Sequence, residues 1–279
     1  MTSHDVVAKL RRGLKIKKVG HAGTLDPLAT GVLIICVGNA TRLSEYVMHA
    51  TKRYRAQVHL GVTTDTYDAE GAITQQRDAS AIQRADVEAK IGLFLGDINQ
   101  MPPMYSAIKQ GGRKLYDLAR SGQTVERELR PVRIDSLDIV NWSPPEFTLD
   151  VVCSAGTYIR SLAYDLGEVL GVGAHLSGLA RLSSGTFRLE EAETLETLLT
   201  SDDWQQYLIT PQIALADWPT VQLSADETEH ILHGRSIQQS DQRATDLAFG
   251  YGADSQLVAI LRADAGLWRP HKVFSDLNT

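Results

Sequence analysis

The sequence of 279 residues contains only two cysteines, and none of its apolar runs is long enough to span a membrane. The first residues are polar and do not form the apolar core of a secretion signal. We therefore expect a cytoplasmic protein in which Cys36 and Cys153 are reduced thiols buried in strands. The sequence has no internal repeat and no low-complexity segment, and its apolar content of 43% is ordinary for a globular protein.

The sequence also lacks the common motifs for cofactors. It has no glycine-rich phosphate loop, no dinucleotide-binding fingerprint and no Cys and His spacing typical of a metal site. Its eight histidines are scattered. His230 and His233 lie within one turn of a predicted helix, but without partner ligands they are expected to be surface residues. These absences are consistent with a protein that needs neither a cofactor nor a metal ion.

Charge is distributed unevenly along the chain. The net charge is −6, yet residues 1–60 carry ten Lys and Arg against three Asp and Glu. Residues 201–279 carry five Lys and Arg against eleven Asp and Glu. Positive charge therefore gathers in the N-terminal part, where a polyanion such as RNA would be attracted.

The most informative feature is the stretch from Gly20 to Gly31, which places one carboxylate, Asp26, between glycines. Pro27 fixes its own φ and disfavours helical geometry at Asp26, and a β-branched apolar run at residues 32–37 predicts a buried strand. An acid on a rigid loop beside a buried strand is a candidate for chemistry. The alternative is an Asp that only helps to form a turn.

Apolar and polar side chains alternate along residues 52–60, which predicts a half-buried strand there. Tyr54 falls on the apolar side of this strand and is expected to face inward. Residues 131–142 and 147–153 also predict strands. Residues 157–170 predict a helix with Leu162, Leu166 and Val169 on its apolar face.

The stretch from Gly20 resembles, nearly residue for residue, the catalytic motif of the TruB-type tRNA pseudouridine synthases. Four further segments resemble motifs of this family, and they occur in the order and at the spacing found in the family. These segments are residues 52–55, 61–68, 103–109 and 153–160. The resemblance runs from residue 2 to about residue 199 and is weaker beyond. It implies an α+β fold, with a mixed, mostly antiparallel sheet flanked by helices and a small PUA-like, β-rich C-terminal domain.

The resemblance also implies a domain plan. Residues 1–200 would form the pseudouridine synthase catalytic domain, with an insertion at about residues 100–130 that closes on RNA. Residues 215–279 would form the PUA-like RNA-binding domain. Family members usually have a strand and a Lys-Pro-x-Gly segment before the Thr-Ser that opens the first helix. This chain starts Met1-Thr2-Ser3, so we expect either a missing strand or a misassigned start site.

The implied reaction is the isomerisation of uridine 55 in the T-loop of tRNA to pseudouridine, which consumes no cofactor. The resemblance makes Asp26 the catalytic carboxylate, paired with Arg160, and Tyr54 the aromatic platform for uracil and a candidate for proton transfer at C5. Without the resemblance, Arg160 could be a helix-surface ion pair and Tyr54 a core tyrosine. The route stays open, because Asp26 could attack C6, attack C1′ or remove a proton from C2′.

Further residues match positions that contact the nucleotide or RNA in the family. His21 would fill the space that the flipped base leaves. The other matches or candidate RNA contacts are Tyr158, Leu179, Asp68, Lys109, Arg113 and Lys114. The expected partner is the T-arm of tRNA, with no membrane, no obligate protein partner and a monomeric state. The alternatives are a tRNA-binding folding factor with incidental catalysis, a guide-RNA-dependent isomerase and a generic α/β hydrolase.

Overall fold

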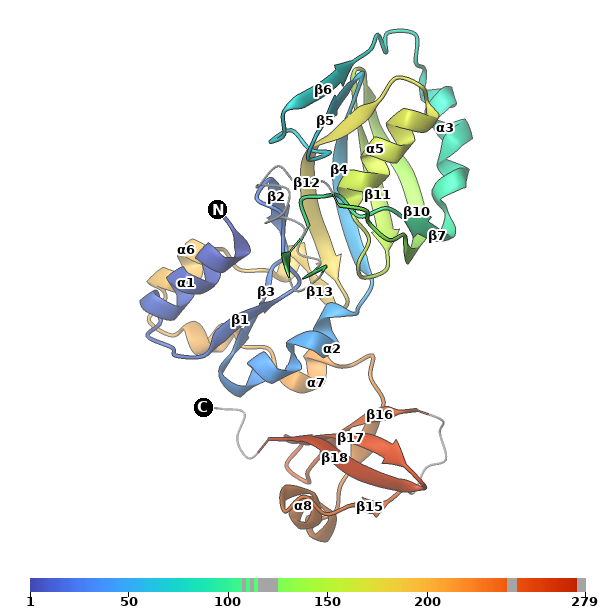
Figure 1. The fold of residues 1–279 in the computed structure, drawn as a ribbon. Helices are drawn as coiled ribbons and strands as arrows, with labels where there is room; N and C mark the ends of the chain where they lie inside the picture. The colour runs from blue at the N-terminus through green and yellow to red at the C-terminus, as the bar shows by residue number, and fades with distance from the viewer. Residues whose placement is uncertain (107–108, 111–112, 115–124, 240–244, 275–279) are drawn as a thin grey trace. The chain divides into compact units, whose positions relative to one another are not determined.

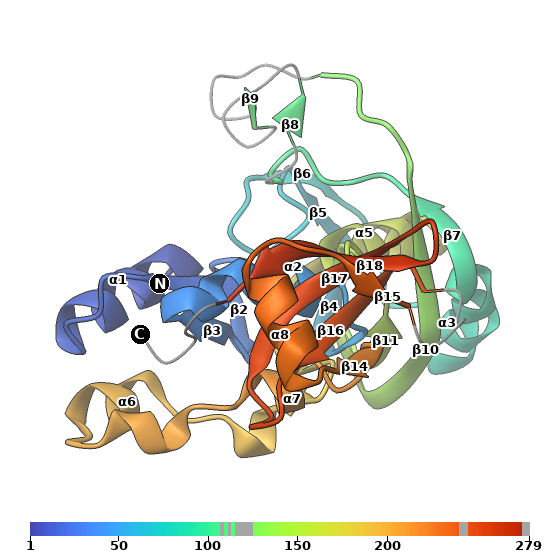
Figure 2. The ribbon, with the colours of Figure 1, turned by 90° about the horizontal axis from the view of Figure 1, so that it is seen from below.

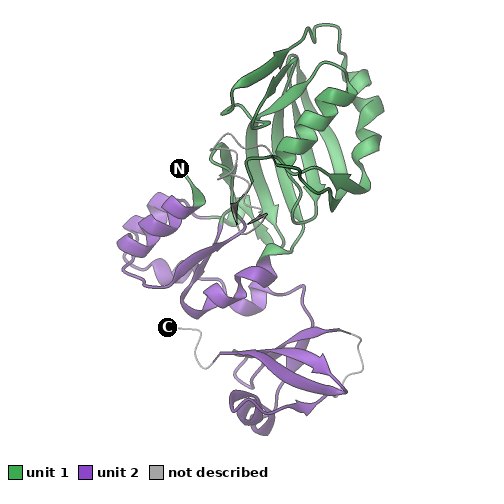
Figure 3. Cartoon of the chain, viewed as in Figure 1, with its two compact units in different colours: residues 1–3, 24–33, 48–192 green, residues 4–23, 34–47, 193–279 purple. Residues whose placement is uncertain are grey.

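The computed structural model describes residues 1–279 except 107–108, 111–112, 115–124, 240–244 and 275–279, and it does not describe the side chains of 107–124 (Figure 1). The chain forms two compact units, which Figure 3 shows in green and purple. Unit 1 comprises residues 1–3, 24–33 and 48–192, and unit 2 comprises residues 4–23, 34–47 and 193–279. These units group contacts in space, so the functional domains 1–200 and 215–279 remain predictions.

Unit 1 is built on a seven-stranded sheet with the order β13-β12-β4-β11-β10-β7, in which β2 lies beside β12 (Figure 1). Only the β2–β12 pair is parallel, so the sheet is mixed and mostly antiparallel, as predicted. The strands are β2 (Ala29–Gly31), β4 (Lys52–Leu60), β7 (Gly96–Gln100), β10 (Arg130–Ser143), β11 (Glu146–Cys153), β12 (Ala174–Ser184) and β13 (Phe187–Arg188).

Two helices cover the apolar face of this sheet. Helices α3 (Arg84–Ile91) and α5 (Ile159–Val169) bury their apolar residues in one core with the inward residues of β4, among them Tyr54. The predicted strand at 52–60 and the inward position of Tyr54 are confirmed. The prediction for Val169 is wrong, because it is 42% exposed, so the apolar face of α5 ends before its last turn.

Shorter elements complete unit 1. A hairpin of β5 (Val62–Thr64) and β6 (Ile73–Gln76) precedes α3. Strands β8 (Lys109–Gln110) and β9 (Arg113–Lys114) form a second small ladder. Two 3₁₀-helices, η2 (Gly92–Phe94) and η3 (Leu189–Glu191), follow α3 and β13.

Unit 2 contains most of the N-terminal helix and a two-stranded sheet. These elements are α1 (Ser3–Gly13), β1 (Val19–Ala22), β3 (Ile34–Val37), η1 (Gly38–Leu43) and α2 (Ser44–Met48). The predicted strand 32–37 is shortened to Ile34–Val37, because Val32 pairs instead with Arg181 of β12. After residue 192 the chain adds α6 (Leu195–Thr200), η4 (Trp204–Tyr207) and α7 (Pro211–Ala214).

The C-terminal part of unit 2 is a five-stranded sheet with the order β14-β16-β17-β18-β15, consistent with the predicted β-rich domain. Helix α8 (Ala225–Leu232) packs on this sheet, as Figures 1 and 2 show, and begins with a capping box between Ser224 and Glu227. The strands are β14 (Thr220–Gln222), β15 (Ile237–Gln238), β16 (Leu247–Tyr251), β17 (Leu257–Asp264) and β18 (Leu267–Val273).

Both cysteines are free and buried, as predicted, and burial raises the pKa of each thiol to about 11. Within the described ranges, every helix is too short or too polar to cross a membrane.

Candidate active site

The loop that carries Asp26 is fixed on both sides of this residue. Before it, Leu25 donates its main-chain N–H to the Ser3 hydroxyl at 3.0 Å, and the Ser3 hydroxyl donates to the Leu25 carbonyl at 3.2 Å. After it, the Asp26 carbonyl accepts from Ala29 N at 2.9 Å, and β2 then joins β12. Because main-chain bonds hold both flanks, the carboxylate has a defined position in unit 1.

Arg160 holds this carboxylate in a bidentate pair. Its Nε donates to Oδ2 of Asp26 at 2.9 Å, and its Nη2 donates to Oδ1 at 3.1 Å. The same guanidinium donates to the carbonyls of Thr66 at 3.2 Å and Tyr105 at 2.9 Å. A planar guanidinium with its donors engaged in this way keeps one orientation, which a lysine could not reproduce. The predicted pairing of Asp26 with Arg160 is present.

Burial and charge act in opposite directions on Asp26. Loss of solvation raises the pKa of the Asp26 carboxyl above its ordinary value, the positive charge of Arg160 opposes this rise, and the nearby charge of Asp68 adds to it. The Arg160 side chain is only 5% exposed, whereas that of Asp26 is 36% exposed. Asp26 is therefore an accessible carboxyl whose ionised form depends on a buried cation.

Asp68 is the second carboxylate beside Arg160, with its Oδ2 3.5 Å from Nη1. It is buried, and its Oδ1 accepts from Thr66 Oγ1 at 2.6 Å and from the main-chain N–H of Glu70 at 3.1 Å. Its carbonyl accepts from Thr64 Oγ1 at 2.7 Å. These bonds place Asp68 as support for Arg160.

Tyr54 and Tyr158 lie within the electrostatic reach of Asp26. Burial raises the pKa of both phenols, and the charge of Asp26 contributes to each rise. Tyr158 immediately precedes α5, and the buried Gln100 side chain holds its main chain by accepting from Tyr158 N at 2.8 Å and donating to Tyr158 O at 3.0 Å. The first turn of α5 is thereby fixed together with Arg160.

Leu179 of β12 completes the group of predicted residues in unit 1. It is half-buried and lies between Ala56 of β4 and Ala29 of β2 in the sheet register. The structure thus brings Asp26, Arg160 and Asp68 into one ion-pair cluster, and it pairs Leu179 with Ala29 directly after the loop of Asp26.

Two sets of predicted residues are not placed at this site. His21 lies on β1 in unit 2, where its ring meets the edge of His4 with centroids 5.5 Å apart, so its contact with RNA stays a prediction. Lys109, Arg113 and Lys114 have described backbones in β8 and β9, but their side chains lie outside the described residues.

Some residues at the site have no predicted role. The carbonyls of Thr66 and Tyr105 hold Arg160, and both residues belong to motifs 61–68 and 103–109, so the motifs contained that signal. Gln100 and Arg181 lie outside the motifs. Arg181 is 1% exposed, and no signal in the sequence points to it, because a charged residue in a strand normally faces solvent.

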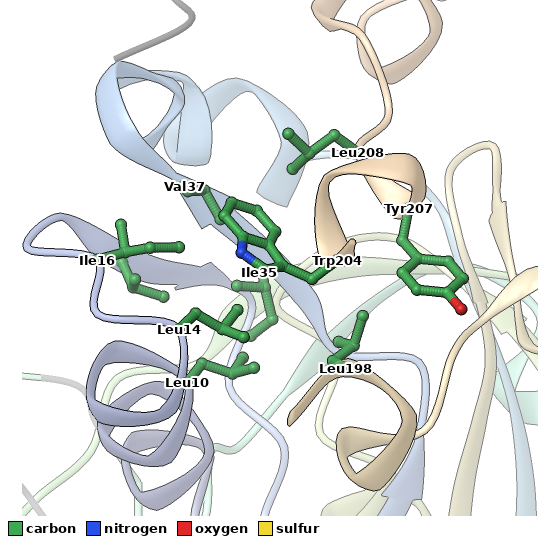
Figure 4. Close-up of a pocket in the computed structure, with 10 residues that line it drawn as sticks. Leu10, Leu14, Ile16, Ile35, Val37, Leu198, Trp204, Tyr207 and Leu208 are labelled. Atoms are coloured by element: carbon green, nitrogen blue, oxygen red, sulfur yellow. The ribbon is translucent and has the colours of Figure 1, made fainter. Parts of the chain in front are cut away.

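Unit 2 contains an apolar pocket of about 90 Å³, shown in Figure 4. Tyr207 is its one titratable lining residue, so it offers no acid–base pair. Its lining residues are Leu10, Leu14, Ile16, Val19, Ile35, Val37, Leu198, Trp204, Tyr207 and Leu208. Throughout the described part of the chain, no group of three or more His, Cys, Asp or Glu side chains is placed to hold a metal ion.

The chain matches two family models. Residues 11–159 match the TruB family pseudouridylate synthase N-terminal domain, and residues 160–212 match the tRNA pseudouridylate synthase B C-terminal domain. A curated relative named tRNA pseudouridine synthase B, from Symbiobacterium thermophilum, is 51% identical over 237 residues, which cover 84% of this chain and 78% of the relative. A relative of the same name from Burkholderia pseudomallei is 43% identical, covering 98% of this chain and 93% of the relative.

A solved structure described as a Cbf5-Nop10-Gar1 complex superposes with a TM-score of 0.76 at 26% identity, covering 100% of this chain and 83% of the matched chain. A second, of an H/ACA RNP bound to a substrate RNA, has the same TM-score at 24% identity, with the same shares covered, and supports the fold. The ordered motifs, the geometry around Asp26 and the family models agree. The chain belongs to the TruB family of pseudouridylate synthases.

Proposed function

We propose that this protein is a tRNA pseudouridine synthase that isomerises uridine 55 in the T-loop of tRNA without a cofactor. The observation that carries the proposal is the bidentate pair between Asp26 of the family's catalytic motif and Arg160 of the segment 153–160. Family membership and relatives named tRNA pseudouridine synthase B support the substrate class.

The reaction rearranges bonds within one nucleotide. The bond from ribose C1′ to N1 of uracil breaks, the base turns, and a bond from C1′ to C5 forms. C5 then loses its proton and N1 carries one, so the product is an isomer of the substrate. In each open route, attack on C6, attack on C1′ or removal of the C2′ proton, the acting group is the ionised Asp26 carboxylate. Arg160 keeps that carboxylate charged and oriented.

Tyr54 would act on the base itself. Its ring offers a face for uracil, and base–aromatic stacking contributes about 1–3 kcal/mol to binding. Its hydroxyl would transfer the proton at C5. The charge of Asp26 contributes to the raised pKa of this phenol, which supports the proposal that both groups act on one nucleotide.

The remaining predicted residues would bind the flipped nucleotide and the RNA around it. Tyr158 and Leu179 would line the base pocket, and Asp68 would support Arg160. His21 would occupy the space that the base leaves, which helps to offset an unstacking cost of a few kcal/mol. Lys109, Arg113 and Lys114 would contact phosphates, which contribute most of the affinity and little of the specificity.

We propose the domain plan as part of this function, with catalysis in residues 1–200 and RNA binding by a PUA-like domain in residues 215–279. The proposed state is a cytoplasmic monomer without an obligate protein partner. The solved Cbf5 neighbour is a complex with Nop10 and Gar1. Light scattering of this protein, alone and with tRNA, is therefore the direct test of the proposed monomeric state.

Activity is tested by carbodiimide mapping of pseudouridine in tRNA transcripts before and after treatment with the purified protein. We expect one new pseudouridine, at position 55, with no added cofactor or guide RNA. A folded protein that binds tRNA and promotes its folding but leaves uridine 55 unchanged would overturn the proposal in favour of a folding factor. A requirement for guide RNA would also overturn it.

A further inference from the structure

Arg181 is an unusual residue in the core of unit 1. It is 1% exposed and is the largest of the fully buried side chains in the described chain. It lies on β12 directly opposite Tyr54 of β4, and cross-strand partners project to the same face of a sheet. A buried guanidinium is unfavourable unless hydrogen bonds compensate it, so its contacts indicate what it does.

The first contact joins Arg181 to the loop of Asp26. Its Nε donates to the carbonyl of Val32 at 2.7 Å, and its own carbonyl accepts from Val32 N at 2.9 Å. The preceding Gly31 lies so close that a Cβ there would be 2.3 Å from the Arg181 carbonyl oxygen. The end of the catalytic loop is therefore attached to β12 at Arg181.

The second interaction joins Arg181 to Tyr54, because the two buried residues are cross-strand partners and the guanidinium opposes the rise in the pKa of the phenol. A guanidinium has donors only, so in a hydrogen bond between the two groups the Tyr54 oxygen is the acceptor. Such a bond would orient the phenol oxygen and leave the phenol proton for another acceptor. The register of β12 shifts between Arg181 and Ser183, and such bulges often re-aim a side chain beside an active site.

We propose that Arg181 is a positioning residue that holds the Tyr54 hydroxyl in place relative to the loop of Asp26. In this proposal one rigid guanidinium binds both proposed reacting segments. Its Nε binds the loop of Asp26, and the same guanidinium binds the phenol of Tyr54. This inference rests on the proposed function, since it concerns how Tyr54 acts on uracil.

The charges around Tyr54 support this role. Burial raises the pKa of the phenol most, Arg181 opposes that rise, and Cys153 and Asp26 add to it. Lys52, on the same face of β4, is nearby, and its ammonium group donates to the carbonyls of Met48 and Ala50 at 2.7 Å each. Burial and the charge of Arg181 lower the pKa of Lys52 to about 8. Replacing Arg181 with a neutral residue should raise the pKa of Tyr54 further, because the phenolate loses the stabilising charge of Arg181.

The test compares Arg181→Lys and Arg181→Met with Arg55→Lys. Arg55 pairs with Ala180 next in register, but it lies on the exposed face of β4 and bonds Asp150. Lysine at position 181 keeps the charge, yet a single ammonium cannot reproduce the guanidinium fork that spans loop and phenol. We expect the single-turnover rate of Arg181→Lys to fall about tenfold to a hundredfold, with tRNA affinity within about threefold of wild type. Arg55→Lys should retain the wild-type rate.

A double-mutant cycle separates positioning from general damage. If Arg181 acts through the Tyr54 hydroxyl, Arg181→Lys should change the rate by less than about threefold in a Tyr54→Phe background. A full multiplicative loss in that background, in a variant with wild-type circular dichroism, would overturn the inference.

Titration of the Tyr54 phenol, followed by the ¹³Cζ resonance, needs no turnover and therefore separates this inference from the proposed function. We expect the phenol pKa to rise in Arg181→Met and to stay unchanged in Arg55→Lys. An unchanged Tyr54 titration in Arg181→Met would refute the contact. If Arg181→Met does not fold, the cycle with Arg181→Lys decides. If the wild-type protein forms no pseudouridine, the proposed function fails while the titration still tests the position of Arg181.

Discussion

Arg160 donates two hydrogen bonds to the carboxylate of Asp26, although the two residues are 134 positions apart in the sequence. The same guanidinium is bound by the carbonyls of Thr66 and Tyr105, so four separate segments of unit 1 meet at one buried cation. Because the protein itself binds the guanidinium from several sides, its orientation does not depend on the substrate. The carboxylate is thus positioned before RNA binds, which avoids an entropic cost at the moment of reaction.

Asp26→Asn should abolish turnover while tRNA binding persists. Asparagine keeps the size of the side chain but removes the negative charge and the basic oxygen, and phosphate contacts dominate affinity for RNA. We expect single-turnover formation of pseudouridine to fall below about one thousandth of the wild-type rate, with the Kd for tRNA within a few-fold. Carbodiimide mapping and filter binding measure the two quantities. A variant that modifies tRNA at the wild-type rate would show that another residue performs the chemistry.

Arg160→Lys should slow the reaction and move its acid limb to higher pH. Lysine keeps a positive charge but cannot hold the carboxylate bidentately and bind two carbonyls, so we expect a loss of roughly a hundredfold. Arg160 opposes the rise in the pKa of Asp26, and a weaker opposing interaction leaves that pKa higher. Asp26 then becomes protonated at a higher pH, and activity should begin to fall at a higher pH than in the wild type. A pH profile of the single-turnover rate with an unmoved acid limb would contradict this account of the ion pair.

The resemblance to the family's ordered motifs predicted the pairing of Asp26 with Arg160, and alternation along residues 52–60 predicted the inward position of Tyr54. Arg181 could not be predicted in the same way. A charged residue in a strand normally faces solvent, and the register shifts of β12 make simple alternation unreliable there. The predicted strand at residues 32–37 was too long for a related reason. The pairing of Val32 with Arg181 is a tertiary contact, and the apolar sequence of residues 32–37 alone cannot predict it.

Asp165→Asn should stabilise the protein at neutral pH and have little effect at pH 4. Burial raises the pKa of Asp165 to about 6 from an ordinary value of 3.8, and Glu168 adds to the rise. The folded state therefore binds more protons than the unfolded state between about pH 4 and pH 6, so stability decreases as pH rises through that window. Above it, the charged Asp165 costs up to about 3 kcal/mol, which asparagine would not incur.

Urea unfolding of wild type and Asp165→Asn at pH 4 and pH 7.5 measures this difference. We expect a gain of about 1–3 kcal/mol at pH 7.5 and a much smaller change at pH 4. A matched control is Glu168→Gln, which removes the neighbouring charge but not the burial of Asp165, and should recover only a minor part of the gain. An equal gain from Asp165→Asn at both pH values would show that its charge is not the cause.

Gly31→Ala should damage the catalytic loop more than Gly156→Ala, although both glycines have a positive φ. Gly31 has a φ of +97° and Gly156 a φ of +86°, so alanine is strained by about 1–2 kcal/mol at either position. At Gly156 a Cβ meets no atom within 4 Å, whereas at Gly31 it would lie 2.3 Å from the Arg181 carbonyl oxygen and 2.8 Å from the Arg181 nitrogen. These are main-chain atoms of β12, which cannot move aside as a flexible side chain could.

Gly31→Ala must therefore push the loop away from the sheet and displace Asp26 from Arg160. We expect a larger loss of unfolding free energy than in Gly156→Ala, by about 1–3 kcal/mol, together with a fall in single-turnover rate of more than tenfold. Equal stability and equal rates for the two variants would mean that the loop does not need its close approach to Arg181.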